Sequence, residues 1–502
     1  MNWMTLVKGA LIALAGLQGP GAAEGGEKPN IIIVFADDMG FGDVSCYHPE
    51  SRISTPNMDR LAAEGIRFTD AHSADSVCTP SRYGLMTGRY CWRTPLKRTV
   101  LFNWEPPLIK AGRTTMASLL KRAGYRTFLS GKWHLGLGFT AKEGRTVDFE
   151  APLPWEGTRL PNQEVGESID FSSRIFGGPE ELGFDECYYT AGCSTDQEPF
   201  CFIENGRMLN MEQAAYRNPS GSWRSGMAAP DWVNETVDVT FTEKALAYLD
   251  EHHASETEAP FFLYLPLSSP HSPHVTADFA LGESDAGTRG DMVWLVDWAL
   301  GQVDAKLNEL GLVEETVVIV TSDNGPLDGS LGPGEPEGTA KVTNGHIATG
   351  PLRGKKGRVW EGGHRVPFIA RWPGRIPAGM VSDYAFCFTD LLATVSELVE
   401  ESLPEGEGED SISMLSALLG QTLPDRPAMV HHSNTAFAMR SGKWKIVFGQ
   451  GGKRVKPAPG NGYLFDLEKD PEETIDLWAE HPELVEALTL EFKTIVGGDL
   501  KK

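Results

Sequence analysis

Short apolar runs alternate with amphipathic stretches along most of the chain after residue 29. The runs within 30–40, 259–271 and 316–325 are short and rich in Ile, Val, Leu and Phe, which predicts buried strands that end in loops. The spacing of apolar residues in 54–72, 239–253 and 294–312 predicts helices, and 115–134 is typical of a helix, a glycine turn and a strand. Strands that alternate with helices predict an α/β fold with a large, mostly parallel sheet covered on both faces.

Several regions depart from this alternation. Residues 142–232 are rich in Gly, Pro and polar residues, and we expect an elaborated insertion over one face of the sheet. Residues 326–350 form a glycine-rich loop region, and 400–410 form an acidic stretch. The tail has strand signals in 437–449 and 462–470, followed by a helical segment at 481–496. We therefore expect a main domain over 29–424 and a small C-terminal α+β subdomain with an antiparallel sheet over 425–502.

Composition narrows the class of protein. The chain has 502 residues, of which 41% are hydrophobic, and its formal net charge is −24. That charge argues against nucleic acid or anionic membranes as partners. Residues 1–23 predict an export signal, because Lys8 precedes a short apolar run and Ala23 ends a small-residue cleavage site. No later segment is apolar enough to span a bilayer, and we expect a soluble periplasmic or secreted protein.

The cysteine count is odd. Of the seven cysteines, Cys187, Cys193 and Cys201 lie close in sequence and could contribute a disulfide. At least one cysteine must then be unpaired or chemically used. Cys78 attracts attention because it lies in a turn marked by Pro80 and Arg82, just ahead of a predicted helix. A thiol there could be structural, half of a disulfide, a metal ligand or a nucleophile.

Polar residues collect where the predicted strands end. Ligands of open parallel sheets bind beyond the carboxyl ends of the strands. Oxygen ligands stand at two of these ends, and such a set favours a hard divalent cation, calcium before magnesium: Asp37, Asp38, Asp323 and Asn324. Either pair alone is more typical of an ordinary turn, but both pairs at the ends of strands in one α/β chain favour a metal site.

Basic residues occur near the same strand ends. Arg82, Lys132 and Lys356 would offset the charge of three carboxylates and bind a tetrahedral oxyanion. Taken singly, each lysine is more often a solvated surface residue. His134 and His271 follow two of the predicted strands and add candidates for proton transfer.

The segment 76–90, "SVCTPSRYGLMTGRY", combines C-x-P-x-R with a trailing TGR. It resembles the signature of the type I sulfatases, the formylglycine-dependent arylsulfatase family of the alkaline-phosphatase-like superfamily. The segments "NIIIVFADDMGFGD", "SGKWHLG", "PHSPH", "TSDNG" and "RGKKGRVWEGGHRVP" follow in the family's order, and "FAMRSGKWKIV" with "YLFDLEKDPEET" resembles its C-terminal subdomain. The resemblance covers nearly the whole chain after the export signal. It implies an alkaline-phosphatase-like fold and sulfate ester hydrolysis.

The resemblance also implies a role for each motif residue. A maturation enzyme would oxidise Cys78 to formylglycine, whose hydrate would attack sulfur, and Arg82 would hold it. The calcium ligands would be the formylglycine at 78 and the four oxygen ligands named above. Lys132 and Lys356 would bind sulfate, although Lys355 precedes Lys356 where the family usually has Gly and is an alternative. His271 would protonate the leaving group and His134 would deprotonate the second hydroxyl of the hydrate, while His274 offers a second histidine in the same motif.

The sequence gives little information about the identity of the substrate. Family analogy favours a sulfated carbohydrate or polysaccharide fragment. Candidate substrate contacts lie near the motifs, although each residue type is more often found in packing or in solvent: His72, Asp75, His274, Arg358, His364 and His432. Two alternatives stay open at this point. One is a phosphonate monoester hydrolase or phosphodiesterase of the same superfamily, and the other is an unmodified, non-catalytic glycan-binding protein.

Overall fold

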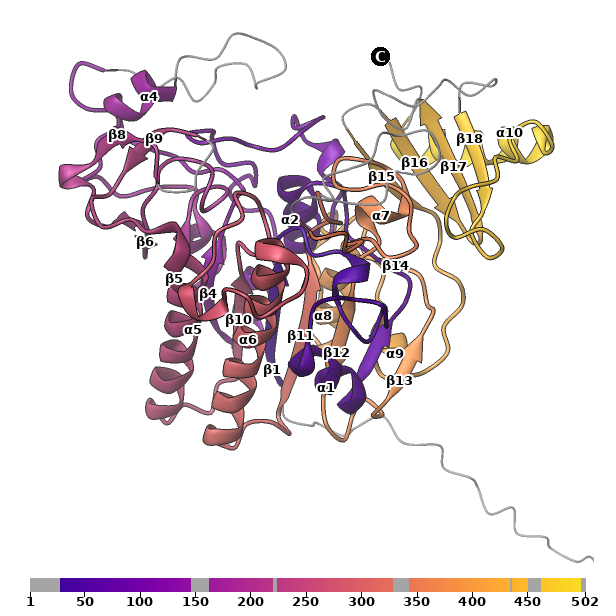
Figure 1. The fold of residues 1–502 in the computed structure, drawn as a ribbon, viewed down its shortest axis with the longest axis horizontal. Coiled ribbons are helices and arrows are strands. Elements are labelled where there is room, and N and C mark those ends of the chain that lie inside the picture. The colour runs from indigo at the N-terminus through magenta and orange to yellow at the C-terminus, as the bar shows by residue number, and fades with distance from the viewer. Residues whose placement is uncertain are drawn as a thin grey trace, which may run out of the picture.

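A ten-stranded sheet runs through the centre of the molecule (Figure 1). The computed structural model describes residues 28–145, 162–219, 224–327, 343–433, 436–449 and 462–497. The expected export signal lies outside these residues. The strands, in their order across the sheet, are β13 (Met380–Ser382), β2 (Ile66–Phe68), β12 (Phe368–Arg371), β11 (Thr316–Ser322), β1 (Asn30–Ala36), β10 (Phe261–Pro266), β4 (Arg126–Lys132), β5 (Glu186–Thr190), β6 (Ile203–Glu204) and β7 (Arg207–Met208).

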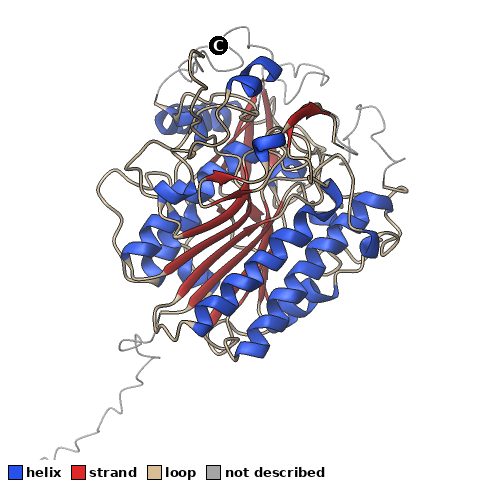
Figure 2. Ribbon diagram, turned by 90° about the vertical axis from the view of Figure 1, so that its left-hand side faces the viewer, coloured by secondary structure: helices blue, strands red, loops and turns tan. Residues whose placement is uncertain are grey.

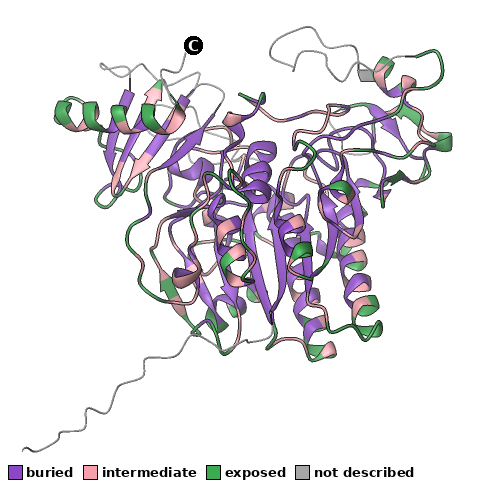
Figure 3. Ribbon diagram, turned by 180° about the vertical axis from the view of Figure 1, so that it is seen from behind, coloured by how far each residue is buried: buried purple, intermediate pink, exposed green. Residues whose placement is uncertain are grey.

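The centre of this sheet is parallel. β1 pairs in parallel with β10 and with β11, so that Ile33 stands beside Tyr264 on one side and Ile319 on the other. β4 extends the parallel set from β10 to β5, whereas β12, β6 and β7 run antiparallel to a neighbour. The predicted parallel core is therefore confirmed, with a mixed arrangement toward the edges. Every residue of β1 is buried, because helices cover both of its faces (Figure 3).

Helices flank the sheet on both sides (Figure 2). α1 (Pro56–Glu64), α5 (Val237–Ala254) and α6 (Gly287–Leu310) pack together, and α2 (Cys78–Thr87), α3 (Met116–Arg122) and α8 (Asp390–Leu398) form a second packed group. α3, α5 and α6 confirm the helices predicted from apolar spacing, whereas the helix predicted in 54–72 ends at Glu64 and the residues after it form β2 and β3 (Ala71–His72). Local sequence also decides where α3 begins, because the Thr115 hydroxyl accepts a hydrogen bond from the Ser118 amide at 3.0 Å. Shorter helices are α4 (Asn162–Ser168), α7 (Glu361–His364) and α9 (Leu415–Leu418).

The region expected to be an irregular insertion contributes to the central sheet. Within it, β5 continues the parallel set, and β8 (Ala215–Arg217) pairs with β9 (Gly226–Ala228) in a separate ribbon. β5 has the sequence ECYYT, which has neither a long aliphatic run nor a regular alternation. The sequence pattern therefore did not predict β5, because this strand depends on its pairing with β4 rather than on its own residues.

The C-terminal part forms a second, smaller sheet. Its antiparallel strands are β15 (Met429–His432), β16 (Ala436–Ser441), β17 (Trp444–Gly449) and β18 (Gly462–Asp466), and α10 (Pro482–Val496) packs against β17. This confirms the expected antiparallel sheet. A further pair, β3 (Ala71–His72) with β14 (Phe386–Cys387), forms a separate two-stranded parallel sheet.

All seven cysteines fall within the described residues, and all are free thiols. The disulfide that Cys187, Cys193 and Cys201 could contribute is therefore not formed in this structure. Cys187 lies in β5, whereas Cys193 lies in the loop that follows and contacts Lys132. Across the residues that the structure describes, no helix is both long enough and apolar enough to cross a membrane.

Candidate active site

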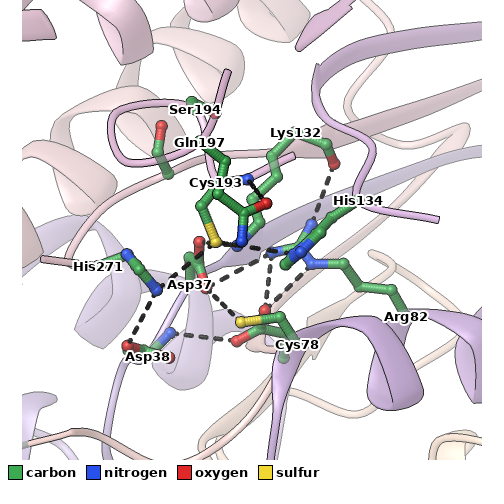
Figure 4. A network of polar contacts seen from close by, with 12 residues as sticks. Asp37, Asp38, Cys78, Arg82, Lys132, His134, Cys193, Ser194, Gln197 and His271 are labelled. Atoms are coloured by element: carbon green, nitrogen blue, oxygen red, sulfur yellow. Dashed lines mark hydrogen bonds and ion pairs between the residues drawn. The ribbon is translucent and has the colours of Figure 1, made fainter. Parts of the chain in front are cut away.

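Polar side chains that follow four parallel strands meet at one edge of the central sheet (Figure 4). Asp37 follows β1, Lys132 ends β4, His271 lies in the loop after β10, and Asp323 follows β11. The first residue of α2, Cys78, enters the same edge. Parallel pairing brings these ends together, as the sequence predicted from the order of its strands.

Cys78 lies inside the helix rather than in a turn ahead of it. Val77 is the extended residue before α2, and Cys78 is the first helical position. The Cys78 side chain is buried, and its sulfur lies 3.5 Å from Asp37 Oδ1 and 3.2 Å from Lys356 Nζ. The start of a helix favours an electron-rich group at this position, because the unpaired backbone N–H groups concentrate there.

Arg82 lies one helical turn beyond Cys78 and is completely buried. Its Nε and Nη2 donate to Asp323 Oδ2 at 3.1 and 2.8 Å, and Nη1 donates to the Lys132 carbonyl at 3.1 Å. Arg82 thus fixes α2 to β4 and to β11. Its guanidinium orients a carboxylate beside Cys78.

Three carboxylates and one amide form an oxygen-rich cluster. Asp37, Asp38, Asp323 and Asn324 are all buried. The Asn324 amide nitrogen donates to Asp38 Oδ1 at 2.7 Å, while its oxygen Oδ1 is buried without a hydrogen-bond partner. Burial and the neighbouring Asp37 carboxylate raise the pKa of Asp323 well above its usual range. A buried orphan oxygen beside carboxylates that repel each other fits a hard divalent cation.

Two ammonium groups contact this cluster. Lys132 Nζ forms a close ion pair with Asp37, and Lys356 Nζ lies 2.6 Å from Asp38 Oδ1. Burial opposes ionisation of Lys356, but Asp38, Cys78 and the other carboxylates of the site together outweigh it and raise the pKa of Lys356. Of the two adjacent lysines in the glycine-rich segment, the structure brings Lys356 to the site.

The two candidate histidines have different electrostatic environments. Burial and the Lys132 ammonium lower the pKa of His134 to about 4, which keeps the ring neutral. Its Nε2 lies 2.8 Å from the Leu101 carbonyl, so Nε2 carries the proton and Nδ1 faces inward as an acceptor. Burial and Lys356 lower the pKa of His271, but the Asp37 and Asp38 carboxylates raise it, and the net shift is upward.

His271 and Lys356 are the partly exposed members of the site. Their side chains are 12% and 13% exposed, whereas those of Asp37, Lys132 and Arg82 are 0% exposed. A substrate therefore meets His271 and Lys356 first, from the solvent side. This places a group that can donate a proton where the leaving part of a substrate would extend.

Sequence reasoning did not assign Cys193 to this site. Its sulfur lies 3.3 Å from Lys132 Nζ, 3.7 Å from His271 Nε2 and 3.8 Å from His134 Nδ1 (Figure 4). Gln197 positions the loop by accepting a hydrogen bond from the Cys193 amide at 3.2 Å. The odd cysteine count was a signal for a chemically used thiol, but it did not distinguish Cys193 from the others.

The candidate substrate contacts separate into a fully buried pair, a largely buried pair and a half-buried pair. His72 and His364 are fully buried and join His431 in a histidine cluster near the C-terminal sheet, which differs from the expectation that they contact substrate. His432 Nδ1 lies 3.6 Å from Asp75 Oδ2, and both residues are largely buried. The remaining two candidates are half-buried: His274 and Arg358.

Comparisons with known proteins agree with this site. A family model described as Sulfatase matches residues 29–401. An N-acetylgalactosamine-6-O-sulfatase of Bacteroides thetaiotaomicron is 32% identical over 92% of this chain and 92% of its own length. Human arylsulfatase A is also 32% identical, over 92% of this chain and 86% of its own. A solved structure from work on glycosaminoglycan metabolism by Bacteroides thetaiotaomicron superposes with a TM-score of 0.77 and 31% identity, covering 94% of this chain and 99% of that one. The chain belongs to the sulfatase family and is a sulfuric ester hydrolase.

Proposed function

We propose that the protein hydrolyses a sulfate ester of a sulfated carbohydrate, with Cys78 converted to formylglycine and one Ca²⁺ at the site. Family membership supports the reaction class. The similar Bacteroides protein named an N-acetylgalactosamine-6-O-sulfatase supports a sugar sulfate as substrate, as does the similar structure from work on glycosaminoglycan metabolism. An amino-sugar 6-sulfate is therefore the first substrate to test.

The donor set of the site supports the cation. Asp37, Asp38, Asp323 and Asn324 would hold Ca²⁺, with the converted side chain at position 78 as a further oxygen ligand. The buried, unpartnered Asn324 oxygen is suited to this role. When bound, the cation would neutralise the carboxylates and lower the pKa of a hydroxyl at position 78.

The C-x-P-x-R segment supports conversion of Cys78 by a formylglycine-generating maturation enzyme, which is the expected protein partner. The hydrated aldehyde would supply one oxygen nucleophile for sulfur and a second hydroxyl whose deprotonation lets sulfate leave. The start of α2 holds this position rigidly, and Arg82 stabilises the adjacent Asp323 carboxylate at 2.8 Å.

Two lysines would bind the sulfate oxygens. Lys356 Nζ is 3.2 Å from the Cys78 sulfur, so its ammonium is within reach of a group bound at that atom. Lys132 lies on the other side of the site, in contact with Asp37. Their positive charges would admit an anionic substrate to a site lined with carboxylates.

The histidines would move the protons. His271 lies on the solvent side, where its imidazolium would protonate the oxygen of the leaving sugar. His134 is neutral and holds its inward Nδ1 free of a proton, so it would accept the proton of the second hydroxyl. The opposite pKa shifts of His271 and His134 favour this division of roles.

The observation that carries the proposal is that Lys356 Nζ contacts both the Asp38 carboxylate and the Cys78 sulfur. The test combines peptide mass analysis across 76–90 with sulfate release from a panel of sulfated sugars, aryl sulfate and aryl phosphonate. We expect the formylglycine mass and release of sulfate from a sugar. A persistent thiol in active protein, or a large preference for phosphonate, contradicts the proposal.

Export is a separate part of the proposal. Residues 1–23 have the features of an export signal, and we propose a periplasmic or secreted location. Sequencing of the N-terminus of protein from the native host, after cell fractionation, tests it. A chain that begins at Met1 and stays in the cytoplasm contradicts this part alone.

A further inference from the structure

Two thiols and one imidazole converge in the site while Cys78 is still a cysteine. The sulfurs of Cys78 and Cys193 and a ring nitrogen of His271 lie within 4.8 Å of one another. Cys193 Sγ is 3.7 Å from His271 Nε2. A tetrahedral zinc site with Zn–S near 2.3 Å and Zn–N near 2.0 Å needs edges of about 3.5–3.8 Å, so only small shifts would be required.

The structure also orients His271 as a metal ligand. Its Nδ1 lies 2.5 Å from the Ser272 carbonyl, which accepts a hydrogen bond from the ring and fixes the proton on Nδ1. In the neutral form of the ring, which a bound cation would select, Nε2 is an acceptor that faces the two sulfurs. A hydrogen bond from the second ring nitrogen to a carbonyl is the arrangement that orients imidazole ligands in metal sites.

The charged side chains beside the two thiols already balance one another in pairs. Lys132 pairs with Asp37, and Lys356 pairs with Asp38. A dication with two thiolates would add no net charge to this buried cluster. Each thiolate also has an ammonium donor, since Lys132 lies 3.3 Å from Cys193 Sγ and Lys356 lies 3.2 Å from Cys78 Sγ. Ammonium donors at these distances stabilise sulfur in its anionic form.

We propose that the unconverted chain binds a soft divalent cation such as Zn²⁺ through Cys78 Sγ, Cys193 Sγ and His271 Nε2. Two thiol protons are released to solvent when the cation binds. Asp37 Oδ1 lies 3.5 Å from the Cys78 sulfur and would have to move toward Cys193 to serve as the fourth ligand. Thiolate and imidazole ligands select zinc, whereas the neighbouring carboxylates and amide suit calcium.

Conversion of Cys78 changes this preference. Replacement of its sulfur by oxygen leaves one thiol and one imidazole, and the hard oxygen ligands then dominate. Conversion of Cys78 would therefore change the preference of the site from a soft cation to a hard cation. The zinc site concerns the chain before conversion, so it can be tested whether or not the proposed sulfatase reaction holds.

The experiment uses the full chain, produced in a host without the maturation enzyme and titrated with Co²⁺ as a spectroscopic substitute for Zn²⁺. We expect one equivalent to give a thiolate-to-cobalt charge-transfer band and the visible bands of tetrahedral cobalt. Cys193→Ser and Cys78→Ser should each reduce the thiolate band at one equivalent by at least half, because only one thiolate ligand is left. Each should also weaken Zn²⁺ binding by at least about 100-fold, because changes outside the ligand shell alone cost 10–100-fold. Cys46→Ser, a half-buried cysteine with a different set of neighbours, is the matched control and should bind as the parent does.

An unchanged cobalt spectrum in Cys193→Ser overturns the proposal, as does the absence of a thiolate band in the parent chain. X-ray absorption of the zinc-loaded parent gives a reading independent of any variant. Two sulfur neighbours support the site, and a shell of nitrogen and oxygen alone contradicts it. The fully converted chain should lose the thiolate band, and its sulfate release is measured separately.

Discussion

The guanidinium of Arg289 forms a two-point ion pair with the carboxylate of Asp43, with both nitrogen–oxygen distances at 2.7 Å. Arg289 Nη2 also donates to the backbone carbonyl of Asp38 at 3.0 Å. Asp38 has a φ of 71°, a conformation that costs a non-glycine residue free energy unless its surroundings hold it. The buried pair therefore holds a candidate metal ligand in its required conformation.

Arg289→Lys should weaken Ca²⁺ binding by about 10- to 100-fold, because lysine cannot make both contacts at once. Calorimetric titration with Ca²⁺ measures the effect directly. The control is Arg60→Lys, which alters an arginine–aspartate pair in which Arg60 is 46% exposed and should change nothing measurable. Unchanged Ca²⁺ affinity in Arg289→Lys would show that the loop holds its conformation without this pair.

Cys78→Ala should reduce sulfate release by at least about 10⁴-fold, because the nucleophile is lost. Ion chromatography of released sulfate measures it, with Cys46→Ser as the control for removal of a cysteine elsewhere. Full activity in Cys78→Ala would falsify the proposed mechanism.

His271→Gln should affect substrates according to their leaving groups. A sugar alkoxide needs a proton to leave, so we expect a loss of about 10²–10⁴-fold in kcat on a sugar sulfate. A nitrophenolate leaves without protonation, so the loss on nitrophenyl sulfate should be much smaller. Equal losses on both substrates would assign His271 to binding rather than to proton donation.

Removal of Ca²⁺ by a chelator should abolish activity and lower Tm, and added Ca²⁺ should restore both. The carboxylates of Asp37, Asp38 and Asp323 repel one another without a cation, and burial together with Asp37 raises the pKa of Asp323. Ca²⁺ at 100 times its Kd should add about 2.7 kcal/mol to the free energy of unfolding. Asn324→Leu removes one oxygen ligand and should reduce this Ca²⁺-dependent rise in Tm. If neither the chelator nor added Ca²⁺ changes Tm, the proposed Ca²⁺ site is contradicted.

The histidine cluster at the C-terminal sheet predicts a pH dependence of stability. His72 Nδ1 and His364 Nδ1 are 2.9 Å apart, and the His364 and His431 rings stack at 3.7 Å. Burial lowers the pKa of all three below 6.5. The unfolded chain therefore binds their protons first, and the free energy of unfolding falls as pH drops below about 6.5. The charged groups that surround the cluster come from β16, β17, α7 and the neighbouring loops: Asp70, Glu361, Arg365, Arg440, Lys445 and Glu473.

Glu473 acts in the opposite direction, because burial raises its pKa from 4.5 to about 7. The test is therefore the difference between the parent and His431→Asn, which removes one histidine and keeps Glu473. Below pH 6.5 the parent should lose up to about 1.4 kcal/mol more per pH unit than the variant. Chemical denaturation from pH 8 to 5 measures this, with exposed His253→Asn as the control. Parallel pH profiles would contradict the prediction.

Much of the site could be predicted from sequence because it depends on local order and on the geometry of parallel strands. The carboxyl ends of parallel strands share one edge, so Asp37, Lys132 and Asp323 had to meet once the strands were identified. The structure places Cys78 and Arg82, four residues apart, on one face of α2, whereas the sequence pattern had placed Cys78 in a turn ahead of the helix. Motif order then indicated the family, which the comparisons confirm.

The remaining features depend on contacts between distant segments, which no local pattern encodes. The tertiary structure decided that Cys193 faces Cys78 rather than forming a disulfide, and that Lys356 rather than Lys355 reaches Asp38. The tertiary structure also places His72 in the buried histidine cluster, away from solvent. The sequence by itself determined which chemistry each strand end carries. Burial and long-range packing determined which neighbours each side chain meets, and therefore its charge state and its role.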